Sequence, residues 1–106
     1  ALAVLRQNIA KCRYEDRARV ISGDALSILP QLTGTAFDLI FVDPPYRKNL
    51  YEAVLFSVLK YHLLSEYGIL VSEHSKSIPF SWQEEGLNLY KTRSYGETVL
   101  NFFRRN

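Results

Sequence analysis

The spacing of apolar and polar residues along the chain predicts helices that alternate with strands. Apolar side chains recur every three or four residues over residues 1–11, which predicts an amphipathic helix. The residues on its apolar side, which we expect to face a core, are Leu2, Leu5, Ile9 and Cys12. The same spacing predicts a longer helix over residues 50–64.

Shorter apolar runs, rich in β-branched and aromatic residues, predict strands at residues 18–22, 37–42, 69–73, 87–93 and 98–104. The run FDLIFV is almost continuously apolar, so we expect this strand to be buried on both faces. Tyr67 and Gly68 are expected to end the helical unit that precedes the third strand. The last two strands predict an antiparallel hairpin, with Gly96 in its turn at a positive backbone angle.

This order of elements predicts an α/β fold with a mostly parallel sheet and an antiparallel hairpin at the carboxyl terminus. Open α/β sheets bind ligands beyond the carboxyl ends of their strands. Two predicted strand ends carry distinctive residues: Gly23-Asp24-Ala25 and Asp43-Pro44-Pro45-Tyr46. We expect a short helical segment to begin at Asp24, which would act as its N-cap, and to be interrupted by Pro30.

Composition narrows the class of protein. With 106 residues, of which 47% are hydrophobic, the chain forms one globular domain at most. A net charge of +2 is compatible with a nucleic-acid partner and does not demonstrate one. The single cysteine, Cys12, excludes an internal disulfide and fits a cytoplasmic protein, while no apolar run approaches the roughly 20 residues that span a bilayer. His, Cys and carboxylate residues are not clustered, so we expect no metal site.

The segment Asp43-Pro44-Pro45-Tyr46 is the strongest chemical signal in the sequence. Proline fixes its own φ angle and favours extended conformations in the residue before it. Asp43 and Pro44 would therefore present a carboxylate and a carbonyl as two fixed acceptors, with the ring of Tyr46 available for stacking. This arrangement suits a flat base that carries an amino group. The alternative is an ordinary turn that ends a strand.

Other candidate residues are open to two readings. Arg47, Lys48 and Asn49 directly follow the motif and would either contact nucleic-acid phosphates or form a solvated loop. Asp24 is either a helix N-cap only or also a ligand-binding carboxylate.

The segment FDLIFVDPPY, with GDA upstream and YGET downstream, resembles the guanine-N2 methyltransferases that act on 16S ribosomal RNA. The resemblance implies a Rossmann-like fold and S-adenosylmethionine as methyl donor, with Asp43, Pro44, Pro45 and Tyr46 facing the target amine. It implies that Asp24 and Ala25 lie near the adenine of the donor, with Asp43 also beside the donor. The implied partner is 16S rRNA, within assembly intermediates of the small subunit.

The chain departs from this family in one respect. It contains no Gly-x-Gly sequence, whereas the family has a glycine-rich donor loop and a ribose-binding acidic residue upstream of a segment similar to residues 1–11. The chain also contains no methionine, so we do not expect Ala1 to be a natural initiation site. We therefore expect residues 1–106 to be the C-terminal part of a single methyltransferase domain without its first strands. Such a chain is expected to be inactive alone, marginally stable and able to self-associate through unpaired strand edges.

Three other functions are the alternatives to guanine-N2 methylation. Adenine-N6 methylation of DNA uses a similar acceptor motif. Glutamine methylation of release factors is disfavoured, because those enzymes usually carry Asn at the position of Asp43. The third is a binding or structural fragment without activity.

Overall fold

The computed structural model describes residues 2–43, 48–77 and 86–105, and of residues 48 and 49 it describes the backbone alone. The elements follow one another in the order α1 (Leu2–Lys11), α2 (Ala25–Ile28), the 3-10 helix η1 (Leu29–Leu32), β1 (Phe37–Val42), α3 (Lys48–Lys60), β2 (Leu64–Ser75), β3 (Leu87–Tyr95) and β4 (Thr98–Arg105). None of the described helices is long and apolar enough to cross a membrane.

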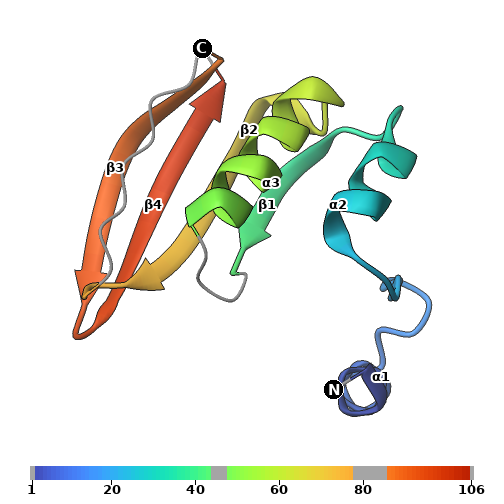
Figure 1. Ribbon diagram of the computed structural model, residues 1–106. Helices are drawn as coiled ribbons and strands as arrows, with labels where there is room; N and C mark the ends of the chain where they lie inside the picture. The colour runs from blue at the N-terminus through green and yellow to red at the C-terminus, as the bar shows by residue number, and fades with distance from the viewer. Residues whose placement is uncertain (1, 44–47, 78–85, 106) are drawn as a thin grey trace.

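The four described strands form one mixed sheet in the order β1-β2-β4-β3. β1 and β2 are parallel, whereas β4 is antiparallel to both of its neighbours. In Figure 1, α3 lies over one face of the sheet and α2 lies beyond the edge formed by β1. The predicted α/β class and the terminal hairpin are confirmed, and the hairpin turn contains Gly96 at a φ of 59°.

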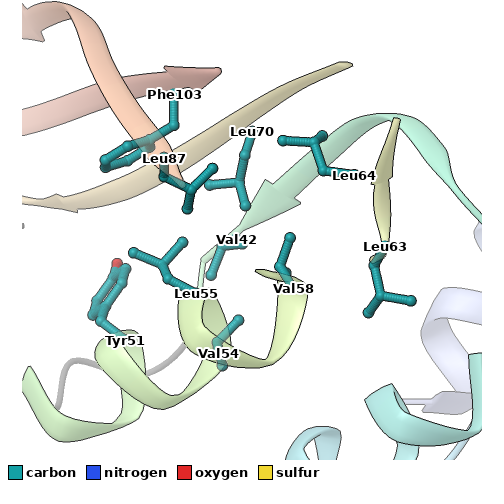
Figure 2. Packing of buried hydrophobic residues seen from close by; sticks show 10 residues of the cluster. All are labelled: Val42, Tyr51, Val54, Leu55, Val58, Leu63, Leu64, Leu70, Leu87 and Phe103. Carbon is teal, nitrogen blue, oxygen red and sulfur yellow. The ribbon is translucent and has the colours of Figure 1, made fainter. Parts of the chain in front are cut away.

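The hydrophobic core lies between α3 and the sheet. Apolar residues at helical spacing place one side of α3 against the strands, and its buried residues are Tyr51, Val54, Leu55 and Val58. Figure 2 shows Leu55 and Val58 directed from the helix towards the sheet, where they meet the layer that contains Val42 and Leu70. Burial of each such side chain stabilises the fold by roughly 1.5–3 kcal/mol.

β1 has the predicted bounds, but the prediction that it is buried on both faces is wrong. Val42 is the one buried residue of this strand, whereas Leu39 is 66% and Phe41 58% exposed. Side chains alternate between the two faces of a strand, so Val42 faces α3 and the other two face the opposite side. The described residues place no element over that side. The apolar run predicted a strand correctly, but it did not reveal what covers the strand.

Residues 18–22 do not form the predicted strand. A strand requires a hydrogen-bonded neighbour, and within the described part of the chain none pairs with this segment. Figure 1 shows it in the connection between α1 and α2, away from the sheet. Its β-branched residues favour an extended backbone locally, but no described strand pairs with this segment.

The boundary between α3 and β2 also differs from the prediction. The helix ends at Lys60 instead of residue 64, and His62 adopts a φ of 53°, which a helix cannot continue. Leu64 instead begins β2, so Tyr67 and Gly68 lie inside this strand. A Cβ atom at Gly68 would lie 2.9 Å from the carbonyl oxygen of Phe37, so the approach of β1 to β2 requires glycine there.

Helix α1 has nearly the predicted bounds and buries none of its residues. Leu5 is 46% exposed, and Cys12, which follows the helix, is also exposed. The expectation that this stripe faces a core is therefore wrong for the described residues. In Figure 1, α1 lies apart from the sheet.

Candidate active site

Asp43 lies at the carboxyl end of β1, directly after the buried Val42, and its side chain is exposed. Its neighbour in the sheet is β2, because Val42 is in register with Ser72 in the parallel pair. The carboxyl ends of two adjacent parallel strands therefore meet at Asp43. This is the position where an open α/β sheet binds its ligands.

Glu73 is the residue of β2 that lies beside Asp43. The register places it one position after Ser72, and its side chain hydrogen-bonds with that of Asp43. The pKa of Glu73 is raised, first because its protonated carboxyl group donates this hydrogen bond, then because of desolvation and repulsion by the Asp43 charge. The two carboxyl groups therefore interact directly at the carboxyl ends of β1 and β2.

Sequence reasoning did not single out Glu73. The signal that could have found it is its position: both FDLIFV and ILVS are apolar strand sequences followed by one acidic residue. Recognising the pair also requires the parallel register of β1 and β2.

Asp24 is at the predicted helix start. Its backbone carbonyl accepts hydrogen bonds from the N–H groups of Ser27 and Ile28, which makes it the N-cap of α2. Its side chain makes no capping hydrogen bond; instead, Oδ2 accepts the hydroxyl of Ser27 at 3.1 Å. Asp24 and Ala25 are both exposed, and Figure 1 places the start of α2 at the same edge of the sheet as the end of β1. An exposed carboxylate at this edge is free to accept a hydrogen bond from an amino group of a ligand.

The remaining predicted site residues are only partly described. Pro44, Pro45, Tyr46 and Arg47 lie outside the described residues. Lys48 and Asn49 form the start of α3, and their side chains lie outside the description. The structure thus brings Asp43 together with Glu73.

No group of three or more potential metal ligands occurs among the residues that the structure describes. The described part of the site contains the neighbouring carboxyl groups of Asp43 and Glu73, which can accept hydrogen bonds.

Comparison with known proteins identifies relatives over nearly the whole chain. It matches the family described as "Conserved hypothetical protein 95" over residues 1–104. It is 26% identical to "Putative rRNA methyltransferase YlbH" of Bacillus subtilis over 107 residues, covering 99% of this chain and 58% of that protein. It is also 26% identical to "Ribosomal RNA small subunit methyltransferase D" of Escherichia coli K12 over 93 residues, covering 83% of this chain and 44% of that protein.

A solved structure of a conserved hypothetical protein from Streptococcus pyogenes has the same fold. It is 28% identical, superposes with a TM-score of 0.87, and is matched over 99% of this chain and 65% of its own. The chain spans about half the length of the curated relatives named above. Since the family match extends over residues 1–104, the chain belongs to the family described as "Conserved hypothetical protein 95", among whose relatives are proteins named as rRNA methyltransferases.

Proposed function

We propose that the protein containing this chain transfers a methyl group from S-adenosylmethionine to the exocyclic N2 amine of a guanine in 16S ribosomal RNA. The observation that carries the proposal is the position of Asp43 at the carboxyl end of β1, followed in sequence by Pro44, Pro45 and Tyr46. The names of the relatives support an RNA substrate, and they support S-adenosylmethionine as the methyl donor.

The chemistry explains why a carboxylate belongs at this position. An amino group on an aromatic base is a weak nucleophile, because its lone pair is delocalised into the ring. An acceptor that binds the N–H group more strongly as positive charge develops on nitrogen stabilises the transition state more than the ground state. As the N–C bond forms, the bond from the methyl group to the donor sulfur breaks; the nitrogen must then lose a proton, which the carboxylate of Asp43 would accept.

Pro44 and Tyr46 complete the proposed acceptor side. The carbonyl of Pro44 would accept from the second N–H of the amine, and the ring of Tyr46 would stack on the base. Arg47, Lys48 and Asn49 would contact phosphates of the RNA. We propose that the RNA is presented within an assembly intermediate of the small subunit.

The methyl donor, when bound, supplies an electrophilic methyl group on a sulfonium sulfur. Among the residues of this chain, Asp24 and Ala25 would hold its adenine, and Asp43 would line the space between donor and base. The exposed carboxylate of Asp24 fits this role, because an adenine amino group donates hydrogen bonds.

The test compares substrates. The longest natural polypeptide that contains these 106 residues is incubated with labelled S-adenosylmethionine and one of four acceptors: small-subunit assembly intermediates, free 16S rRNA, duplex DNA or a release factor. We expect N2-methylguanosine, identified by mass spectrometry of nucleosides from the rRNA. Label found only in DNA adenine or in a glutamine side chain would contradict the proposal.

A further inference from the structure

Glu73 is a second acidic residue, which lies beside Asp43 near the carboxyl ends of β1 and β2. The proposed chemistry of methyl transfer does not require it. The amine needs one carboxylate, which Asp43 provides. Nevertheless, the register of β1 and β2 places Glu73 beside Asp43, and the two side chains are within hydrogen-bonding contact. Its side chain is half-buried, so this position restricts the directions from which solvent can approach.

Within the described part of the sheet, the pair has few hydrogen-bond donors beside it. On the side away from Asp43, Glu73 is in register with Leu100 of β4, and Leu100 is in register with Arg93 of β3. The nearest cationic group in this row of the sheet therefore lies two strands away from Glu73. Among the described residues, the contact of Glu73 is therefore with another acidic group, Asp43, and this contact is the first cause of the raised pKa of Glu73.

A base that offers two adjacent donors would satisfy both carboxyl groups. Guanine carries N1–H and the N2 amino group side by side on one edge. Adenine places its amino group beside N1, which has no hydrogen and is an acceptor, and cytosine has the same arrangement at N3. Two neighbouring carboxylates therefore match guanine, and they oppose adenine with one unfavourable acceptor-to-acceptor contact.

We propose that Glu73 determines base specificity by accepting the N1–H of guanine while Asp43 accepts from the N2 amine. This proposal rests on the proposed function, since it assigns a second base contact at the same site. It bears on the alternative of adenine methylation, because a carboxylate at this position disfavours adenine.

The test uses 2-aminopurine, which has the same 2-amino group as guanine but lacks the hydrogen on N1. The target nucleotide is first mapped in rRNA by mass spectrometry, and RNA carrying either base at that site is then prepared by ligation. The wild-type protein should methylate guanine more efficiently than 2-aminopurine by roughly tenfold to a hundredfold in kcat/KM, the effect of one hydrogen bond to a charged group. Equal rates on the two bases would overturn the proposal without any variant.

Glu73→Gln supplies the complementary measurement. The glutamine amide can donate to N1 of 2-aminopurine, so the preference for guanine should fall to about one or reverse. Glu66→Gln is the matched control, because Glu66 is an exposed acidic residue on the same strand, far from Asp43, and its substitution should preserve the preference. If Glu73→Gln lowers both rates equally, Glu73 has only a structural role and the proposal is wrong.

The outcome for wild-type protein on natural RNA separates this proposal from the proposed function. Absence of N2-methylguanosine would overturn the function, and the assignment of Glu73 with it. Formation of N2-methylguanosine together with an unchanged preference in Glu73→Gln would overturn the assignment of Glu73 alone.

Discussion

The region up to residue 36 and the sheet with its covering helix α3 differ in how their elements are stabilised. In the first region, α1, α2 and η1 contain no buried residue. All the buried hydrophobic residues of the described chain lie between Val42 and Phe103. Helical spacing is thus enough to produce α1, but packing against a partner is needed before such an element adds stability.

β1 lies at the border between these two regions. One face packs against α3 through Val42, the opposite face exposes Leu39 and Phe41, and the strand ends at Asp43. Its pairing with β2 fixes the position of the acceptor carboxylate. The candidate site therefore depends on the packed region.

Truncation of a core residue should have the largest effect on stability. Leu55→Ala should lower the free energy of unfolding by about 2–5 kcal/mol, because Leu55 is fully buried in α3. Leu5→Ala, which makes the same change in the exposed helix α1, should change it by less than about 0.5 kcal/mol. Urea unfolding of both variants measures the difference, and equal losses would contradict the contrast between the two regions.

Self-association should depend on the open face of β1. Phe41→Glu should raise the concentration needed for association of the chain by roughly tenfold, because it removes an exposed apolar side chain next to an unpaired edge. Sedimentation at several concentrations provides the measurement. Phe56→Glu is the control, since Phe56 is similarly exposed on the outer side of α3. A wild-type chain that is monomeric throughout would refute the expectation.

A buried hydroxyl in the packed region should be slightly destabilising. Ser72 is completely buried, and its Oγ has no hydrogen-bond partner among the described residues. Ser72→Ala should therefore stabilise the chain by about 1 kcal/mol. Ser65→Ala is the matched control on the same strand: the Ser65 hydroxyl donates to Asp38 at 2.8 Å, so its loss should not stabilise. Thermal unfolding of the two variants tests the prediction, which fails if Ser72→Ala destabilises.

The pair formed by Asp43 and Glu73 should make a smaller, pH-dependent contribution to the free energy of unfolding. Because the pKa of Glu73 is raised in the folded chain, the folded state binds the proton more tightly than the unfolded state. This contribution is fully present below the ordinary pKa of 4.5 and is lost as the pH rises through the raised pKa. Among the described residues of this row of the sheet, the charged groups are Asp43 on β1 and, across Leu100, Arg93 on β3.

Glu73→Gln should accordingly be more stable than wild type at pH 7, where the two carboxylates repel each other. The advantage should shrink as the pH falls towards 4. Urea midpoints of the two proteins across this range give the comparison, and a difference that does not vary with pH would contradict the coupling of Glu73 with Asp43.

Local patterns predicted much of the packed region. The bounds of β1, the terminal hairpin and the positive φ of Gly96 follow from apolar runs and turn residues. The end of α3 did not follow, because Leu63 and Leu64 continue the helical spacing. The pairing of Leu64 with Phe37 instead makes this segment part of β2. Burial of β1 was not predictable either, since it depends on what lies over the strand.

The site shows the same division. Asp43 was found from its own neighbours in sequence, because two prolines after an apolar run mark a strand end. Glu73 was not predicted, because its position beside Asp43 depends on the register of β1 and β2, which come from separate segments of the chain. Contacts of that kind are properties of the fold, and no local pattern contains them.

The role of Asp43 as the acceptor of the site is best tested by one pair of variants. Asp43→Ala and Asp38→Ala remove the same carboxylate from the two ends of β1, and Asp38 contacts only Ser65 among the described hydrogen bonds. Formation of N2-methylguanosine in rRNA is measured with the longest natural polypeptide that contains the chain. We predict that Asp43→Ala lowers kcat by about a hundredfold or more, while Asp38→Ala stays within a few fold of wild type. Equal activity of the two variants would contradict the account.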